Sequence, residues 1–194
     1  MTEFIFATKN AGKLKEINEI MRNCGVRVIS AAEAGFDFPI AETGNTFEEN
    51  AIIKARAVCK ASGRPSLADD SGLEVDYLNG EPGVHSADFM GYDTPYGIRN
   101  RRILELLSGV PVEKRTARFI CVIAAAFPDG RVLTERAAME GQIALEICGE
   151  SGFGYDPIFL LPDKGVTSAE LSIDEKNAIS HRGKALRQMA EQLR

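Results

Sequence analysis

Strand-like and helix-like hydrophobic patterns alternate along the N-terminal part of the chain. The run Phe4-Ile5-Phe6-Ala7 is apolar and typical of a strand. After Lys13 the apolar residues recur at helical spacing up to Gly25, namely Leu14, Ile17, Ile20 and Met21. Val26 to Ile29 then resembles a second strand. This pattern predicts a strand, a loop over Thr8–Lys13, a helix and another strand.

The clearest helix signal begins at Thr46. Thr46-Phe47-Glu48-Glu49 fits a capping box, in which a hydroxyl and a glutamate satisfy free backbone N–H groups. Apolar residues follow at helical spacing, and Gly63 with Pro65 ends the helix. Ser66-Leu67-Ala68 then predicts a strand that ends at Asp69-Asp70-Ser71-Gly72, ahead of the alternating Leu73, Val75 and Tyr77. We therefore expect two carboxylates at the end of a strand.

Hairpin signals dominate the second half. Asp93-Thr94-Pro95 predicts a helix with proline in its first turn, continuing through Ile98, Ile103, Leu104 and Leu107. Residues 117 to 127 and 131 to 139 predict a hairpin about Pro128-Asp129-Gly130, and Ile143, Leu145 and Ile147 alternate as a further strand. A last helix is predicted from about Ser180 to Leu193. The order of elements favours an α/β fold with a mixed central β-sheet flanked by helices.

Composition narrows the class of protein. A chain of 194 residues, 44% hydrophobic and 26% charged, fits one domain over residues 1–194. The net charge of −5 argues against a nucleic-acid polymer or an anionic membrane as a partner. No apolar run approaches the about 18 residues of a membrane span, and no secretory pattern opens the chain. The four cysteines form no C-x-x-C pair, so we expect a cytoplasmic protein with reduced thiols.

Two segments suggest phosphate and metal chemistry. The loop Thr8–Lys13 precedes a helix N-terminus, where N–H groups and lysines favour an anion, although a solvated polar turn would look the same. It fits neither a Walker A loop nor G-x-G-x-x-G. Oxygen ligands without Cys or His clusters favour Mg²⁺, with Mn²⁺ as a substitute, over zinc. The candidate carboxylates are Glu42, Glu48, Glu49, Asp69 and Asp70, of which the adjacent aspartates could equally form a solvated turn.

Two later segments could contact a nucleobase. Ser151-Gly152-Phe153-Gly154-Tyr155-Asp156-Pro157 combines glycines, which allow close backbone approach, with flat aromatic rings. Glu175-Lys176-Asn177 and Ser180-His181-Arg182-Gly183-Lys184 concentrate hydrogen-bond donors beside a predicted helix start. Each segment alone has an ordinary explanation, as a packed turn in the first case and as a capped helix with a solvated basic face in the second.

Taken together, these segments resemble the inosine triphosphate pyrophosphatase family. The resemblance extends over nearly the whole chain in one order, and the joint occurrence is far more specific than any one motif. The matching stretches are Thr8 to Lys13, Glu42-Thr43-Gly44 with Thr46-Phe47 and Glu49-Asn50-Ala51, Lys54-Ala55, Ala68 to Leu73, Gly152 to Phe159, and Ala169-Glu170-Leu171 through Glu175-Lys176-Asn177 to Ser180-His181-Arg182-Gly183.

The resemblance implies an enzyme with two lobes and an active-site cleft between them. It implies hydrolysis of ITP, dITP and XTP, which are non-canonical purine nucleoside triphosphates, to the monophosphate and pyrophosphate, by a homodimer with Mg²⁺. Glu42 and Asp70 would hold the metal, and Asp70, the family's expected proton acceptor, would either take the proton of the attacking water or fix the ion that does. The remaining implied substrate contacts are Thr8, Lys9, Asn10, Ala11, Gly12, Lys13 and Lys54 for the triphosphate, Ser71 beside it, and Phe153, Gly154, Tyr155, Asp156, Lys176, His181 and Arg182 for the base.

One loop departs from the family pattern. The family usually carries Tyr where His85 stands and Arg where Asp88 stands, so we expect a structural or surface role for His85. Two other functions remain open at this point: a nucleotide-binding module without catalysis, and a hydrolase of modified pyrimidine triphosphates. The joint presence of Asp70, Glu42 and Lys54 favours the enzyme, because a binding module needs no proton acceptor.

Overall fold

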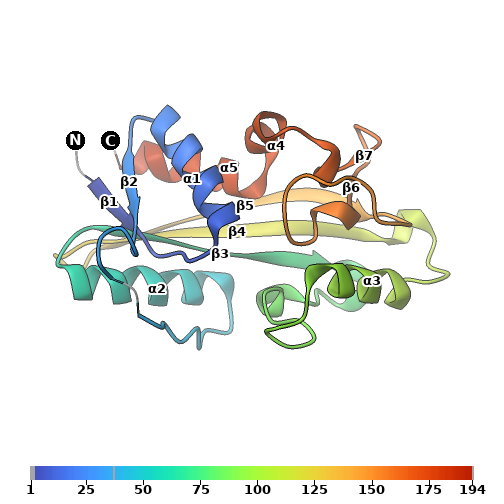
Figure 1. The fold of residues 1–194 in the computed structure, drawn as a ribbon, viewed down its shortest axis with the longest axis horizontal. Coiled ribbons are helices and arrows are strands. Elements are labelled where there is room, and N and C mark those ends of the chain that lie inside the picture. Colours follow the sequence, from blue (N-terminus) through green and yellow to red (C-terminus); the bar gives the residue numbers. More distant parts are fainter. Residues whose placement is uncertain (1–2, 37, 194) are drawn as a thin grey trace. The chain divides into compact units, whose positions relative to one another are not determined.

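The chain folds around a mixed seven-stranded β-sheet with helices. Figure 1 shows this fold in a computed structural model, which describes residues 3–36 and 38–193. The strand order is β2-β1-β3-β4-β5-β6-β7. β1 pairs in parallel with β2 and β3, whereas β6 pairs antiparallel with β5 and β7. The strands are β1 Glu3–Phe6, β2 Arg27–Ser30, β3 Ser66–Val75, β4 Thr116–Ala126, β5 Val132–Ile143, β6 Phe159–Leu161 and β7 Val166–Thr167. The mixed α/β prediction is therefore confirmed.

The described chain divides into two compact units. Unit 1 takes in the chain up to Ser71, Cys121–Ala137 and the chain from Ser180 onward, and unit 2 takes in Gly72–Ile120 and Ala138–Ile179. Unit 1 contains α1 Ala11–Asn23, α2 Phe47–Ser62 and α5 His181–Gln192; unit 2 contains α3 Tyr96–Leu106 and α4 Ile173–Ile179. The candidate residues fall into a separate group in each unit.

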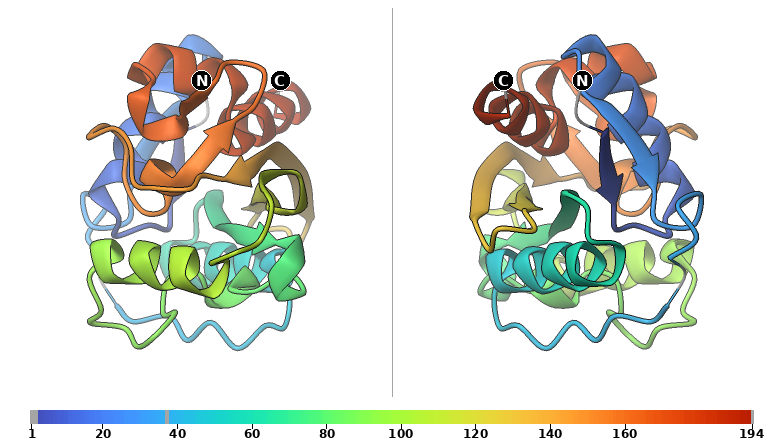
Figure 2. Two further views of the ribbon diagram at one scale, coloured as in Figure 1. Left: turned by 90° about the vertical axis from the view of Figure 1, so that its right-hand side faces the viewer. Right: turned by 90° about the vertical axis from the view of Figure 1, so that its left-hand side faces the viewer.

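Unit 1 has helices on both faces of its strands. α1 and α5 lie side by side on one face, and α2 lies on the other (Figures 1 and 2). The core between α1, α5 and the strands is apolar and includes Phe6, Ile17, Met21, Leu67 and Leu186. Burial of each such side chain stabilises the folded state by about 1.5–3 kcal/mol. The core therefore holds α1 and α5, and with them the first residues of both helices, against the strands.

Unit 2 has an apolar core of its own. Its buried residues come from the later part of β3, from α3, from β4 and β5, and from the segments around β6, and include Leu73, Ile103, Phe119 and Phe159. The Phe119 and Phe159 rings pack with centroids 4.3 Å apart. This core supports the loop that precedes β6, which carries the glycine and aromatic residues singled out in the sequence.

The predicted helix caps are present. The Thr46 hydroxyl accepts a hydrogen bond from the Glu49 backbone N–H at 3.1 Å, and Glu49 Oε2 accepts from the Asn45 backbone N–H. Gly63 ends α2 in the left-handed conformation, with a φ of 65°. The Ser180 hydroxyl accepts from the Gly183 backbone N–H at 3.0 Å at the start of α5. Local capping chemistry therefore predicts these two helices correctly.

The position of the paired aspartates differs from the prediction. β3 does not end at Asp69-Asp70 but continues to Val75, and residues 66–70 are all buried. The parallel neighbour β1 is shorter, since Phe6, its last residue, pairs with Leu67. The aspartates therefore lie inside β3 but just beyond the end of β1, a place that depends on the lengths of two strands distant in sequence.

Three further expectations need correction. Pro95 is the N-cap of α3 and not part of its first turn, and Ile98 is exposed. Leu145 and Ile147 form no strand, since β5 ends at Ile143, and the two residues are 67% and 42% exposed. α4, β6 and β7 were not expected, since each is too short to show a period.

None of the helices in residues 3–36 and 38–193 is long and apolar enough to cross a membrane.

Candidate functional site

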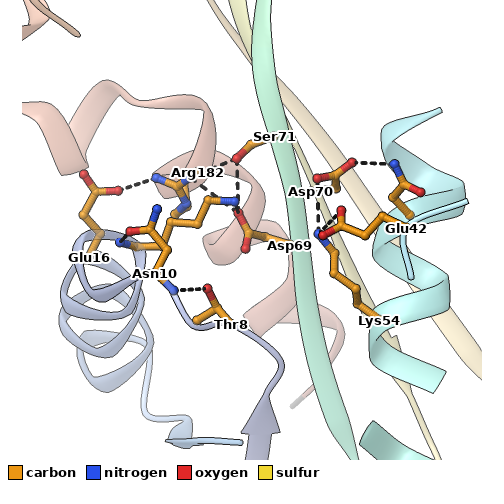
Figure 3. Close-up of polar contacts among 11 residues, drawn as sticks. Thr8, Asn10, Glu16, Glu42, Lys54, Asp69, Asp70, Ser71 and Arg182 are labelled. Atoms are coloured by element: carbon orange, nitrogen blue, oxygen red, sulfur yellow. Dashed lines mark hydrogen bonds and ion pairs between the residues drawn. The ribbon is translucent and has the colours of Figure 1, made fainter. Parts of the chain in front are cut away.

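The polar segment of β3 divides its side chains between the two faces of the sheet. Successive residues of a strand point to opposite faces, so Asp69 and Ser71 share one face and Asp70 the other. Figure 3 shows Asp69 and Ser71 directed toward α1 and Arg182, and Asp70 directed toward α2. The paired aspartates therefore serve two different groups of residues within unit 1.

On the α2 side, two carboxylates meet at one ammonium group. Lys54 Nζ lies 2.8 Å from Glu42 Oε2 and 3.2 Å from Asp70 Oδ1. Asn50 Nδ2 donates to the second oxygen of Asp70 at 3.2 Å. Asn50 and Lys54 are four residues apart on α2, so both point from one face of the helix. The structure thus brings together Glu42, Lys54 and Asp70, three residues to which the resemblance gives roles.

Glu42 is held in place by a close contact between its loop and α2. The Gly44 backbone N–H donates to Asn50 Oδ1 at 2.8 Å. A Cβ on Gly44 would lie 2.6 Å from Glu49 Cβ and 2.9 Å from the Asn50 backbone nitrogen. Only glycine fits this approach. Asn50 therefore joins the Glu42 loop to Asp70 through its two amide atoms.

Burial and neighbouring charges set the protonation of this group. Burial raises the pKa of Asp70 above its ordinary value, and Glu42 and Asp69 raise it further, although Lys54 and Lys13 oppose the shift. Burial would lower the pKa of Lys54, but the charges of Asp70, Asp69 and Glu42 outweigh burial and raise it. Asp70 is thus a more basic carboxylate than an exposed aspartate, beside a lysine that stays charged.

On the α1 side, Asp69 lies among cations. Its Oδ2 atom lies 2.9 Å from Lys13 Nζ and 3.4 Å from Arg182 Nη2, and the Ser71 hydroxyl donates to it at 3.2 Å. Arg182 also donates to Ser71 Oγ at 3.0 Å and forms an ion pair with Glu16. Burial would raise the pKa of Asp69, but Lys13, Arg182 and Lys54 hold it well below the usual range.

The predicted phosphate loop ends in the first turn of α1. Asn10 is the N-cap, and its Oδ1 accepts from the Lys13 backbone N–H at 3.1 Å. Thr8 Oγ1 accepts from the Asn10 backbone N–H at 3.2 Å, and Lys9 is exposed. Ala11 and Gly12 are the first residues of the helix. The turn therefore presents the start of α1 and the Lys13 ammonium close to β3.

The five carboxylates do not form one cluster. Glu48 accepts a hydrogen bond from Thr134, Glu49 caps α2, and Asp69 is turned toward Lys13 and Arg182. In residues 3–36 and 38–193 no group of three His, Cys, Asp or Glu side chains could hold a metal ion. Glu42 and Asp70 remain, and two carboxylates fit Mg²⁺, which completes its coordination with waters and substrate phosphates. Their convergence on the Lys54 ammonium shows that both reach one cation.

In unit 2, the glycine-aromatic loop is fastened to α4. Asp156 Oδ2 lies 2.7 Å from Lys176 Nζ and accepts from the Phe153 backbone N–H at 2.9 Å. The Lys176 ammonium lies 4.7 Å from the centroid of the Phe153 ring. A Cβ on Gly152, which has a φ of 76°, would lie 2.2 Å from Asp156 Oδ2. Asp156 thus ties the turn at Gly152 and Phe153 to Lys176 of α4.

The remaining candidate residues lie outside this turn contact with Lys176. Tyr155 is buried and donates its hydroxyl to the Ser86 carbonyl at 2.8 Å, and Asn100 Nδ2 donates to the Gly154 carbonyl at 3.1 Å. The His85 side chain is 75% exposed beside Asp88, which confirms the expected surface position. His181, in unit 1, is buried as the first residue of α5.

Sequence reasoning missed Glu16 and the role of Asn50. Glu16 is buried on α1, three residues after Lys13 and four before Ile20, so it falls on the helix face that the apolar spacing already marks. A charged residue on a buried helix face needs a partner of opposite charge. The position of Glu16 on this face could therefore have marked it as part of a buried ion pair. Its partner Arg182 comes from a distant segment, which no local pattern indicates.

Comparisons with known proteins cover nearly the whole chain. The Ham1 family profile matches residues 4–192. The dITP/XTP pyrophosphatase of Bacillus subtilis (strain 168) is 50% identical over 193 residues, covering 100% of this chain and 98% of the relative. That of Desulforamulus reducens is 50% identical over 189 residues, covering 97% and 94%. The solved HAM1 protein from Coxiella burnetii matches with a TM-score of 0.90 and 44% identity, covering 100% and 98%.

Proposed function

This chain belongs to the Ham1 family, and on that basis we propose that it is a nucleoside triphosphate pyrophosphatase. It hydrolyses dITP, XTP and ITP to the monophosphate and pyrophosphate, and so removes deaminated purines from the nucleotide pool. The observation that carries this function is the group of Glu42, Lys54 and Asp70, in which a basic buried carboxylate lies beside a charged lysine and a second carboxylate.

The triphosphate is held by the α1 side of unit 1. Thr8, Asn10 and the backbone of Ala11 and Gly12 offer polar groups at a helix N-terminus, where negative charge is favoured. Lys13 supplies a full positive charge at the same turn, and Lys9 adds to the attraction from the exposed side. Ser71, which follows Asp70 on β3, supplies a hydroxyl. A strongly anionic substrate needs this local cationic surface because the whole chain is acidic.

Glu42 and Asp70 would hold Mg²⁺, for which Mn²⁺ could substitute. The ion would supply neutralisation of phosphate charge and polarisation of a phosphoryl oxygen. Lys54 contacts both carboxylates, and its positive charge stabilises the negative charge that develops on the leaving pyrophosphate.

Asp70 accepts the proton of the attacking water. Its carboxylate is held by Asn50 and Lys54, so its orientation is fixed before substrate arrives. Burial raises its pKa, which makes it a better proton acceptor than an exposed aspartate. Attack at the innermost phosphorus releases pyrophosphate, whereas attack at the terminal phosphorus would release orthophosphate.

Each unit has residues suited to contact with a base. In unit 2, the Phe153 ring offers a face for stacking, and Gly154, Tyr155, Asp156 and Lys176 shape and support its turn. In unit 1, His181 and Arg182 supply donors for a 6-keto oxygen. An adenine amino group facing such donors would leave buried donors unpaired, which costs several kcal/mol, or roughly 10³-fold in kcat/KM.

A side-by-side assay tests the function. ITP, XTP, dITP, GTP, ATP and dUTP are offered with Mg²⁺, and pyrophosphate and orthophosphate are measured separately. We expect pyrophosphate from dITP, XTP and ITP, with GTP and ATP far slower. Orthophosphate as the first product would contradict the proposal, and so would preference for dUTP, which would favour a pyrimidine enzyme. Binding without turnover would favour a nucleotide-binding module.

We further propose a cytoplasmic homodimer. Met90, Tyr92 and Ile98 of unit 2 are exposed apolar residues, and Tyr92 is 82% exposed, which supports a contact surface there. Sedimentation equilibrium measures the mass directly. A monomer at micromolar concentration would contradict the homodimer and leave the proposed reaction unaffected.

A further inference from the structure

One carboxylate oxygen accepts from three donors on the α1 side of β3. Asp69 Oδ2 lies 2.9 Å from Lys13 Nζ, 3.2 Å from Ser71 Oγ and 3.4 Å from Arg182 Nη2. The Asp69 side chain is only 1% exposed. Asp69 has no part in the proposed function, although all three donors do. Asp69 therefore contacts two residues proposed to bind the triphosphate, Lys13 and Ser71, and one proposed to contact the base, Arg182.

The three donors are not equally constrained without Asp69. Arg182 has a second carboxylate, Glu16, and a hydrogen bond to Ser71. Lys13, by contrast, carries its charge on a flexible four-carbon stem, and its side chain is 17% exposed, so solvent competes for the ammonium. A fixed buried anion at 2.9 Å selects one position for this ammonium out of many.

Strand geometry explains why Asp69 can act at this point. Asp69 lies next to Asp70 on β3, so any shift of the strand moves both residues together. Because their side chains point to opposite faces, Asp69 contacts Lys13 on one side of β3, while Asp70 contacts Lys54 on the other. The strand thus sets the position of the phosphate-binding lysine and that of the proton acceptor from a single backbone.

We propose that Asp69 is a positioning residue that fixes Lys13 and Ser71 for contact with the triphosphate. This proposal rests on the proposed function and adds to it a residue that acts only through its neighbours. A purely structural role for Asp69, as a counter-ion that stabilises buried Arg182, predicts lower stability on substitution but no specific effect through Lys13.

A double-mutant cycle tests the connection with Lys13. Asp69→Asn keeps the side-chain volume and removes the charge. We expect kcat/KM for dITP to fall about tenfold or more, with KM raised, because a misplaced charged group loses phosphate binding. In a Lys13→Met background the same substitution should change kcat/KM by less than about threefold. Independent, multiplying effects of the two substitutions would overturn the proposal.

Two variants serve as controls in the same assay. Asp76→Asn removes a carboxylate that also accepts from an arginine and a hydroxyl, those of Arg118 and Thr116, but lies in unit 2. It should leave kcat and KM unchanged. Asp69→Glu keeps the charge and should recover part of the lost kcat/KM. Thermal melting shows whether Asp69→Asn folds. If it does not, Asp69→Glu replaces it: the proposal predicts an altered KM in the presence of Lys13 and an unaltered KM in the Lys13→Met background. The same change of KM in both backgrounds would overturn the proposal.

A second measurement does not depend on turnover. Lysine acetylation by acetic anhydride, followed by mass spectrometry of the Lys13 peptide, reports how freely this ammonium reaches solvent. Lys13 should react several-fold faster in Asp69→Asn than in the natural chain, and at an unchanged rate in Asp76→Asn. Equal rates in all three proteins would overturn the proposal. A natural chain that releases no pyrophosphate from dITP would instead contradict the proposed function and leave this measurement interpretable.

Discussion

Neighbouring residues of one type have different roles here because a strand sends them to different faces. Asp69 is surrounded by Lys13 and Arg182, which hold its pKa low against the effect of burial. Asp70 has one lysine in direct contact and two acids nearby, and burial raises its pKa. Asp70 is therefore the more basic of the two carboxylates, which suits its proposed role as proton acceptor. Side-chain environment, rather than residue type, therefore assigns the chemistry.

The role of Asp70 gives the first prediction. Asp70→Asn should lower kcat by at least about 10²-fold while the triphosphate still binds, because the amide cannot accept the proton. Steady-state kinetics and calorimetric titration with dITP measure the two effects. Asp129→Asn, in an exposed turn of unit 1, serves as the control. Near-normal pyrophosphate release by Asp70→Asn would remove Asp70 from the mechanism.

The four cysteines give a second prediction at this scale. Burial raises the pKa of the Cys121 thiol to about 12 and also raises that of Cys59. At pH 8 the reactive thiolate of Cys121 is therefore only about one part in 10⁴. Iodoacetamide should label half-buried Cys24 and Cys148 first, and Cys59 and Cys121 only after unfolding. Peptide mass spectrometry checks the order, and early labelling of Cys121 would contradict the core described above.

At the scale of elements, α2 positions Glu42, the second carboxylate of the proposed metal site. Its N-terminal cap is fixed by Thr46 and Glu49, and Asn50 in its first turns accepts from the Gly44 backbone. The loop that carries Glu42 is therefore fastened to the same helix that supplies Lys54. A helix predicted from capping and periodicity thus becomes a platform for the site, which its own pattern does not reveal.

This contact gives a third prediction. Gly44→Ala places a Cβ 2.6 Å from Glu49 Cβ, so the loop must move and displace Glu42. We expect kcat/KM to fall about tenfold, with a raised requirement for Mg²⁺, because displacements near 1 Å are costly at such sites. Magnesium titration of the initial rate measures the effect. Gly97→Ala is the matched control, since a Cβ there meets nothing within 4 Å. Unaltered magnesium dependence in Gly44→Ala would show that this contact does not position Glu42.

At the scale of the whole molecule, the proposed metal site has only two carboxylates, because the described residues contain no group of three or more His, Cys, Asp or Glu that could hold a metal ion. Mg²⁺ bound by so few protein ligands needs substrate phosphates to complete its coordination. Its affinity for the free protein should therefore be low, and its effect should depend on the nucleotide.

This dependence gives a fourth prediction. Removing divalent cations with EDTA should abolish pyrophosphate release, and excess Mg²⁺ or Mn²⁺ should restore it. Mg²⁺ alone should raise the melting temperature little, whereas Mg²⁺ with a non-hydrolysable triphosphate should raise it more, because ligand that binds only the native state stabilises it. Full turnover in EDTA would contradict a metal-dependent reaction.

Much of the fold could be predicted because its signals are local. Caps and periodicity mark α1, α2 and α5, and the apolar run before Thr8 marks β1. The failures have non-local causes. Leu145 and Ile147 alternate like a strand, but β5 already extends to Ile143 and leaves both exposed. The short elements α4, β6 and β7 are fixed by packing around Phe159 and its neighbours, which no sequence period records.

By itself the sequence determined which residue types are present and where chain order places them: a polar loop before a helix, acids on an apolar strand, and donors at the start of the last helix. These follow from backbone propensity and spacing, which act over a few residues. Only the tertiary structure decided which acids meet which cations. The extension of β3 beyond β1, the alternation of its faces and the distant partner of Glu16 all arise from contacts between separate segments. Buried charges need partners, and the fold selects them.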